Sequence, residues 1–310
     1  MKTITPPIKS QGIKTKLVPW IMELRGELSG KWIEPFLGTG VVAFNSKAKS
    51  ALLSDINPHI IRFYSDLQKD RITPEIVKHY LQEEGAKLAV AGDNGYDHYR
   101  LVRDRFNTSF DPLDFIFLSR AGFNGMVRFS KKGNWNIPFC KKPNRFSQAY
   151  VTKIVNQTKI CKEMIQKDWS FVCQDFREVI PQAKEGDLIY CDPPYAGRYV
   201  DYYSGWSDED EKDLFELLSQ TKARFILSSW HHNDYRANEN IEKYWNKFNI
   251  ITKDHFYHTG AKEENRNPVV EALIFNFQTN MNTHNHGYKN IKEEQLTLFE
   301  SPSPSMAQAL

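Results

Sequence analysis

Two consecutive prolines in the middle of the chain limit what the preceding residues can form. Residues 187–191 are an apolar run, and Asp192-Pro193-Pro194-Tyr195 follows it directly. Prolines cannot donate the hydrogen bonds of a β-ladder, so a strand over this run has to end there and the chain has to turn. A strand end of this kind is the edge at which open α/β sheets bind ligands.

The chemistry of this tetrapeptide suits a planar amine. The Asp192 carboxylate and the Pro193 carbonyl are two acceptors, and Tyr195 offers an aromatic face. An amine such as N6 of adenine has two N–H donors next to a π system, so it could bind both acceptors and stack on the ring. The alternative is a strand-ending turn in which Asp192 only caps the local backbone.

A second unit near the N-terminus has the pattern of a nucleotide-binding crevice. We expect a strand over residues 31–35, the turn Gly38-Thr39-Gly40, a helix from residue 41, a strand over 51–55, and a helix after Asn57-Pro58. Glycines let the backbone approach a ligand, and Asp55 could accept hydrogen bonds from ribose hydroxyls. The third glycine of the dinucleotide motif is missing, which favours a cofactor with a ribose but no pyrophosphate and disfavours a nicotinamide oxidoreductase.

The remaining patterns divide the chain into an interrupted α/β domain and a tail. Further strands are expected over residues 171–173, 187–191, 225–228 and 270–277, and the periodicity of 208–220 predicts an amphipathic helix. We therefore expect a catalytic domain over 1–58 and 160–279, a mainly helical insert over 59–159, and a disordered tail over 280–310.

The insert contains a stretch without acidic residues. Residues 115–162 have no Asp or Glu. Basic residues neutralise phosphates, amides read base edges, and aromatic rings stack or wedge, so the stretch favours nucleic acid over an inert basic face. Its basic residues are Arg120, Arg128, Lys131, Lys132, Lys141, Lys142, Arg145, Lys153, Lys159 and Lys162, and its interleaved aromatic residues are Phe123, Phe129, Trp135 and Phe146.

Composition sets the broad class. With 310 residues and 40% hydrophobic residues the chain can bury a core, and no segment has the pattern of a signal peptide or a membrane span, so we expect a cytoplasmic protein. The four cysteines show no Cys-x-x-Cys spacing, which predicts neither a metal site nor a disulfide framework. His231 and His232 are interpreted as hydrogen-bonding loop residues and not as metal ligands.

Taken together, these segments resemble the adenine-N6 DNA methyltransferases of the Dam type (alpha group), in the order of that family's motifs. The resemblance covers residues 6–278 and is closest to the EcoRV branch in segments 7–17, 34–44 and 138–146. It implies a Rossmann-like α/β methyltransferase sheet with an inserted, mainly helical DNA-recognition domain, and S-adenosyl-L-methionine (SAM) as the methyl donor.

The resemblance also implies site residues, although the family often has an aromatic residue in place of Ser10. The implied catalytic residues are Asp192, Pro193, Pro194 and Tyr195. Those implied to contact the cofactor are Ser10, Lys14, Glu34, Phe36, Gly38, Gly40, Asp55, Asp175, Phe176 and Asp192. Those implied to contact DNA are Arg120, Phe123, Asn124, Arg128, Lys131, Lys132, Asn136, Lys141, Lys142 and Arg145, with Arg128 on a guanine, Phe123 inserted near the target and Asn124 at the displaced partner. Lys262 and Arg266 fall in the family's phosphate-contacting loop.

The implied activity is methylation of the first adenine of GATATC in double-stranded DNA, which protects the site from a cognate restriction endonuclease. The alternatives are a Dam-like GATC enzyme with a regulatory role, methylation of cytosine N4 or of RNA, and a non-catalytic regulator that binds SAM and DNA. In the tail, Gln295, Leu296, Leu298 and Phe299 resemble the peptide by which bacterial proteins dock on the DNA polymerase sliding clamp, although a stray apolar patch would look the same.

Overall fold

The computed structural model describes residues 2–10, 12–130, 132–195, 205–233, 235–256 and 268–281. Its core is one mixed sheet with the strand order β3-β2-β1-β4-β5-β8-β7, and β6 pairs with the far end of β5. The strands from β3 to β5 are parallel, and β8 is antiparallel to both β5 and β7. The strands are β1 (Trp32–Glu34), β2 (Ser50–Ser54), β3 (Asp168–Val172), β4 (Leu188–Cys191), β5 (Arg224–Asn233), β6 (Arg236–Ala237), β7 (Asn249–Phe256) and β8 (Pro268–Phe275).

The strand order reverses between β1 and β4. The chain runs outward through β1, β2 and β3 and then returns to β4, which pairs with the free side of β1 through Trp32–Leu188 and Ile33–Ile189. At such a reversal the connections leave in opposite directions and the carboxyl ends of the two central strands are exposed as a binding crevice. The residues that follow β1 and β4 are the two segments that the sequence analysis singled out.

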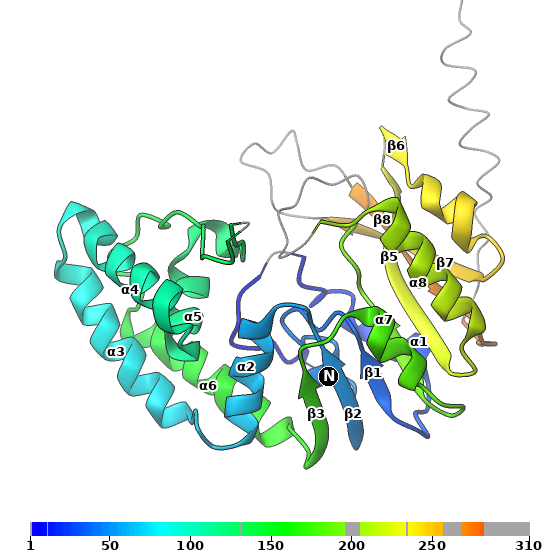
Figure 1. The fold of residues 1–310 in the computed structure, drawn as a ribbon, viewed down its shortest axis with the longest axis horizontal. Coiled ribbons are helices and arrows are strands. Elements are labelled where there is room, and N and C mark those ends of the chain that lie inside the picture. The colour runs from blue at the N-terminus through cyan, green and yellow to red at the C-terminus, as the bar shows by residue number, and fades with distance from the viewer. Residues whose placement is uncertain are drawn as a thin grey trace, which may run out of the picture.

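Helices cover both faces of the sheet (Figure 1). Side chains alternate along β1, so that Trp32 belongs to the same buried cluster as Ile21 of α1 (Val18–Arg25), while Ile33 belongs to a second cluster with Leu214 of α8 (Asp208–Gln220) and Val179 of α7 (Phe176–Val179). Each fully buried aliphatic side chain contributes about 1.5–3 kcal/mol from burial. The α/β class expected from the sequence is confirmed.

Several predicted elements are confirmed, with one helix reduced to a turn. The predicted helix over 208–220 is α8, whose N-terminus has a reciprocal capping box between Ser207 and Asp210. The helix expected from residue 41 is wrong, because only a 3-10 turn forms at Ala43–Asn45. The Asn45 side chain donates to the Val41 carbonyl (2.7 Å), and Lys47 has a φ of 54°, which a continuing helix cannot accommodate.

The strand expected over residues 225–228 extends to Asn233, so His231 and His232 lie in β5 and the interpretation of them as loop residues is wrong. Their Nδ1 atoms are 2.8 Å apart. Burial lowers the pKa of His231 to about 4, so it is neutral at physiological pH.

Four helices form a module beside the sheet (Figure 1). They are α3 (Pro74–Val90), α4 (Tyr96–Ser109), α5 (Pro112–Ala121) and α6 (Gln148–Met164). The expected start of the insert at residue 59 falls inside α2 (Pro58–Gln68), which contacts both the sheet and the helical module. The Tyr64 hydroxyl of α2 donates to the Thr39 carbonyl (2.6 Å), and its ring stacks on Phe171 of β3. In the part of the chain that the structure describes, no helix is long and apolar enough to span a membrane.

Candidate active site and DNA-facing surface

The Asp192 carboxylate lies at the carboxyl end of β4 and pairs with a lysine from the N-terminal segment. The Lys14 Nζ lies 2.9 Å from Asp192 Oδ1, and the lysine side chain is 5% exposed. Burial raises the pKa of Asp192, and the Lys14 ammonium acts in the opposite direction. The ion pair therefore favours an ionised Asp192, which can only accept hydrogen bonds.

Tyr195 is held on both sides. Its hydroxyl donates to Oε2 of Glu271 (2.6 Å), which is fully buried on β8, and the Lys14 Nζ lies 4.7 Å from the centre of its ring. A hydrogen bond to a charged acceptor contributes about 1.5–3 kcal/mol, and a cation over an aromatic face adds to this. The ring is therefore fixed beside Asp192 and not left to rotate at the end of a turn.

Acidic side chains gather around this edge of the sheet. Burial raises the pKa of Glu34 well above its ordinary range, the Trp32 indole N–H that bonds Glu34 Oε2 (2.8 Å) lowers it, and Asp192 and Asp55 raise it further. Glu271 likewise raises the pKa of Asp192. Asp192 is therefore the carboxylate at this edge that is held by a positive charge, while the burial of Glu34 favours its neutral form.

The glycine turn after β1 is joined to Asp55 at the end of β2. Asp55 Oδ2 accepts from the Gly38 amide (2.7 Å), and Oδ1 accepts from the Asn57 amide (2.8 Å). Burial raises the pKa of Asp55 to about 6, although both amides favour the ionised form. Gly38 and Gly40 have φ values of 51° and 76°, and a Cβ on Gly38 would meet nothing within 4 Å. The backbone at Gly38 can therefore be approached by a ligand.

An aromatic cluster continues the crevice. Phe36 packs on Phe176 and on Trp206, with ring centroids 5.4 and 5.6 Å apart. Asp175 caps α7, where Oδ1 accepts from the Arg177 amide (2.9 Å). The structure thus gathers Lys14, Glu34, Phe36, Gly38, Gly40, Asp55, Asp175, Phe176 and Asp192 at the carboxyl ends of β1, β2, β3 and β4, while Ser10 lies in the N-terminal segment.

The expected DNA-reading residues lie on an irregular hairpin between α5 and α6. The hairpin is closed by bridges between Gly122 and Phe139 and between Phe129 and Trp135. At its near end Phe123 and Asn124 form a 3-10 turn in which Phe123 is 48% exposed and Asn124 has a φ of 52°. An exposed phenyl ring on a turn of this kind is available to insert between bases.

Three of the four aromatic residues expected to face nucleic acid are in the core instead. Phe129, Trp135 and Phe146 are at most 9% exposed. The Trp135 Nε1 donates to the Tyr99 hydroxyl (2.9 Å), and Phe129 stacks on His59. These three aromatic residues therefore anchor the hairpin on the helical module and do not face nucleic acid.

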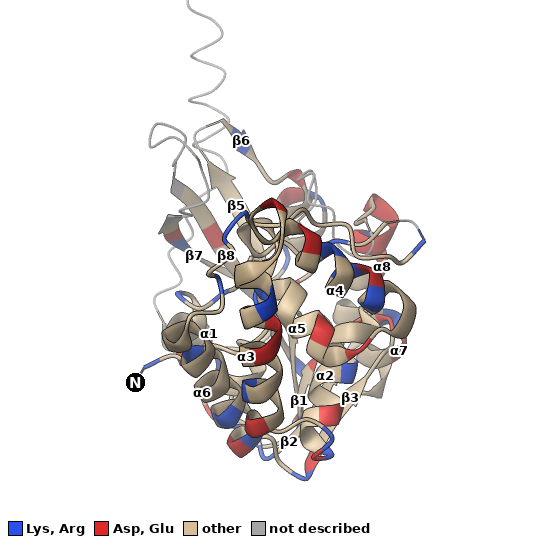
Figure 2. Ribbon diagram, turned by 90° about the vertical axis from the view of Figure 1, so that its left-hand side faces the viewer, with Lys and Arg blue, Asp and Glu red and all other residues tan. Residues whose placement is uncertain are grey.

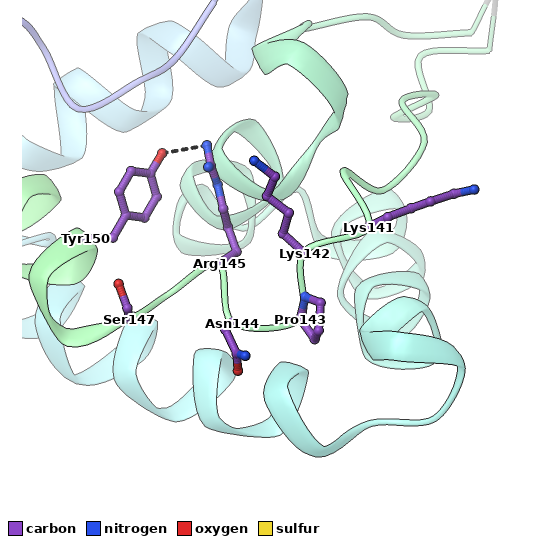
Figure 3. A pocket seen from close by; sticks show the side chains of 7 residues that line it. All are labelled: Lys141, Lys142, Pro143, Asn144, Arg145, Ser147 and Tyr150. Atoms are coloured by element: carbon purple, nitrogen blue, oxygen red, sulfur yellow. Dashed lines mark hydrogen bonds between the residues drawn. The ribbon is translucent and has the colours of Figure 1, made fainter.

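The basic residues fall into two groups on this surface. Arg128 donates from Nη2 to the carbonyl of Asn136 (2.9 Å), across the hairpin from it, while Lys132 is exposed at the hairpin tip. Lys141, Lys142 and Arg145 line a pocket of 510 Å³ (Figure 3), completed by Pro143, Asn144, Ser147 and Tyr150. The module is otherwise of mixed charge, since Figure 2 shows acidic and basic residues together on α3 and α4.

Arg120 is buried, so its expected role as a DNA contact is wrong. The residue is 5% exposed, and its Nε donates to the Pro7 carbonyl (2.6 Å). Its Nη2 donates to Oε1 of Gln157 on α6 (2.7 Å). A guanidinium already bound by buried acceptors is not available to a phosphate.

Two residues at these sites were not expected from the sequence. Glu271 is a lone carboxylate within the apolar strand β8, a pattern that signals a buried partner. Lys9 contacts the DNA-reading turn, because a Cβ on Gly125 would come within 2.5 Å of the lysine side chain. Burial and the nearby Arg145 lower the pKa of Lys9. Lys131, Lys262, Arg266 and residues 295–299 lie outside the described residues.

Comparisons with known proteins identify the family of this chain. The family model of the D12 class N6 adenine-specific DNA methyltransferases matches residues 10–259. A DNA adenine methylase of Vibrio cholerae is 31% identical over 199 residues, 61% of this chain and 67% of that protein. The type II methyltransferase M.FokI of Planomicrobium okeanokoites is 27% identical over 287 residues, 88% of this chain and 43% of that protein.

Among solved structures, the rRNA methyltransferase aviRa of Streptomyces viridochromogenes has a TM-score of 0.33 and 8% identity over 84% of this chain and 82% of that chain. The family match, in contrast, includes Lys14, the glycine turn, the DNA-reading hairpin and Asp192-Pro193-Pro194-Tyr195. The chain therefore belongs to the D12 class of N6 adenine-specific DNA methyltransferases.

Proposed function

We propose that this DNA adenine methyltransferase uses SAM as donor, methylates the first adenine of GATATC in double-stranded DNA, and protects that site from a cognate restriction endonuclease. The observation that carries the proposal is the Asp192 carboxylate, held by Lys14 beside a fixed Tyr195 ring at the carboxyl end of β4.

The residues at the carboxyl ends of β1, β2 and β4 suit SAM, which combines a sulfonium methionine with a ribose and an adenine. Glu34, Asp55 and Asp192 lie at these strand ends. Asp55 would accept from the ribose, the open backbone at Gly38 would lie against the methionine part, and Phe36 and Phe176 would flank the adenine end. When bound, SAM supplies an electrophilic methyl group.

The acceptor residues suit an adenine that has left the DNA stack. A base inside a duplex cannot reach the end of β4, so the target would be flipped out at a cost of a few kcal/mol. Asp192 and the Pro193 carbonyl would then accept the two N6–H bonds, and the ring of Tyr195 would stack on the base. Asp192 acts as an orienting acceptor, and holding the amine in line for attack accounts for up to ~7–11 kcal/mol of the barrier.

The target sequence would be read by the hairpin. Phe123 would enter the helix near the flipped base, Asn124 would support its former partner, and Arg128 would bind a guanine edge. The GATATC assignment rests on the resemblance to the EcoRV branch, and the type II relative M.FokI supports a role in restriction–modification.

Sequencing of DNA from cells that express the protein, with detection of modified adenine, tests the proposal. Methylation confined to GATATC supports it. Methylation at every GATC would instead identify an orphan Dam-like enzyme, and DNA without modified adenine, from cells that contain folded protein, would contradict the activity.

We also propose that Gln295, Leu296, Leu298 and Phe299 dock on the bacterial sliding clamp, with the apolar side chains as anchors. Pull-down of purified clamp by the full chain tests this. The Leu298→Ala/Phe299→Ala variant should lose the clamp, and undiminished retention would contradict the proposal.

A further inference from the structure

The N-terminal segment, residues 4–10 and 12–14, runs from the sheet past the helical module to the catalytic edge. Ile4 exchanges two hydrogen bonds with the Asn45 side chain (2.9 Å each), which fixes its start on the turn after β1. Ile8 is 1% exposed, and Lys14 at its end pairs with Asp192. The segment therefore belongs to the sheet at both ends.

Between these ends the segment is bound by the module through Arg120. The guanidinium of Arg120 donates from two nitrogens to the Pro7 carbonyl, and Nη2 also reaches Gln157 on α6. The Arg120 carbonyl in turn accepts from Nε of Arg145 (2.8 Å), in the basic pocket of Figure 3. A planar fork of this kind fixes direction as well as distance, which a lysine could not reproduce.

The DNA-reading turn touches the same segment two residues further on. Gly125 packs against Lys9, close enough that even a methyl group there would clash with the lysine side chain. Lys9 and Lys14 are five residues apart, a span of at most about 18 Å. The turn and the partner of Asp192 are therefore joined by a short stretch of chain.

We propose that Arg120 is a positioning residue that ties the N-terminal segment to the helical module, so that the docking of DNA on the hairpin sets the position of Lys14 against Asp192. This rests on the proposed roles of Asp192 and Lys14 in methyl transfer. Arg120 makes no contact with DNA in this arrangement. It acts through the Pro7 carbonyl and the segment that follows.

Steady-state kinetics of the full-length Arg120→Gln and Arg120→Lys variants test whether the link from Arg120 to the Pro7 carbonyl (the tie) positions Lys14. We expect kcat to fall by about 10- to 100-fold, because small misplacements of reacting groups cost rates of this size. The KM for DNA should stay within about twofold, and the slope of log K for DNA against log salt concentration should not change. If Arg120 instead contacts a phosphate, Arg120→Gln should raise the KM for DNA and reduce the salt slope by about 1. Arg120→Lys, which keeps the positive charge, should then have the KM and the slope of the wild type.

The pH dependence of kcat separates a positioning role from loss of folding. Among the described residues, the titratable groups that interact with Asp192 are Lys14, Glu271 on β8, Glu34 on β1, and Tyr190 and Cys191 on β4, and none is changed in these variants. If Lys14 moves away from Asp192, the pKa of Asp192 rises. The low-pH side of the kcat profile (the acid limb) then shifts to higher pH, as it should in Lys14→Met. An unshifted acid limb in a folded Arg120 variant contradicts the tie.

Gln157→Leu removes an acceptor of the tie without changing charge, and it should show the same acid-limb shift to a smaller extent. This variant keeps the test decisive if Arg120 variants do not fold, because an unshifted limb there also contradicts the tie. Lys142→Gln, at an exposed residue of the basic pocket, is the matched control: it should raise the KM for DNA and reduce the salt slope, as loss of a phosphate contact does, without shifting the acid limb. An active Asp192→Asn variant would instead overturn the proposed function. Failure of the positioning role of Arg120 can therefore be distinguished from failure of the proposed function.

Discussion

Removal of the Lys14 ammonium by Lys14→Met perturbs the site most directly. At 2.9 Å and an effective dielectric constant of about 20, the gross attraction to Asp192 is ~6 kcal/mol. Breaking a buried pair costs ~3–5 kcal/mol after desolvation, and the 21% exposure of Asp192 places this pair near ~3 kcal/mol. For a domain of this size we expect a decrease in Tm of roughly 6–12 °C.

The effect on catalysis has a defined sign. Burial already raises the pKa of Asp192, and without Lys14 this pKa rises further. Because the ionised carboxylate is the form that accepts both N6–H bonds, kcat should fall about tenfold per pH unit below the new limb, which lies at higher pH than in the wild type. The folded state then binds a proton more tightly than the unfolded state, so the stability deficit of the variant should grow as pH rises through that pKa.

Single-turnover methylation between pH 5 and 9 (a range of about four units, chosen to span the carboxyl titration) measures the limb. Lys16→Met, an exposed lysine two residues away, is the control and should follow the wild type. An acid limb that is the same in Lys14→Met and the wild type would refute the reasoning.

Three further perturbations test the site. Tyr195→Phe should cost about 1.5–3 kcal/mol in kcat/KM through the lost bond to Glu271, and a double-mutant cycle with Glu271→Gln should be non-additive; additivity would show that the pair does not act as a unit. Calorimetric SAM binding should weaken as pH falls through about 6, where Asp55 takes up a proton, and Asp55→Asn should remove this pH dependence while a persistent dependence would exclude Asp55 as its source. Arg128→Ala should relax discrimination at one guanine by ~1–3 kcal/mol in assays on substituted duplexes, whereas a uniform loss across sequences would make Arg128 a phosphate contact.

The sequence was sufficient where a short segment determines its own structure. Pro193 and Pro194 cannot continue a ladder, so β4 had to end at Cys191, and the amphipathic periodicity of residues 208–220 placed α8. Two strands that carry ligand-binding residues at their carboxyl ends are expected to lie side by side and parallel, as β1 lies beside β2 and β4. These local rules account for β1, β2 and β4 and for the residues at their carboxyl ends, but not for β7, which the sequence analysis did not predict.

What the sequence could not show depends on residues far apart in the chain. Glu271 meets Tyr195 across 76 positions, and Arg120 meets Pro7 across 113. A basic residue in an acid-free stretch is equally consistent with a DNA surface and a buried tie, since only the fold decides which acceptors surround it. For the same reason Trp135 was assigned to nucleic acid although its indole bonds the Tyr99 hydroxyl in the core.

The central claim is that the Asp192 carboxylate holds the N6 amine of a flipped adenine for methyl transfer. It is tested most directly by incubating wild-type protein and Asp192→Ala with a GATATC duplex and tritiated SAM, followed by nucleoside analysis. The account predicts N6-methyladenine with the wild type, none above background with the variant, and DNA affinity that is largely retained. Normal turnover by a folded Asp192→Ala variant would contradict it.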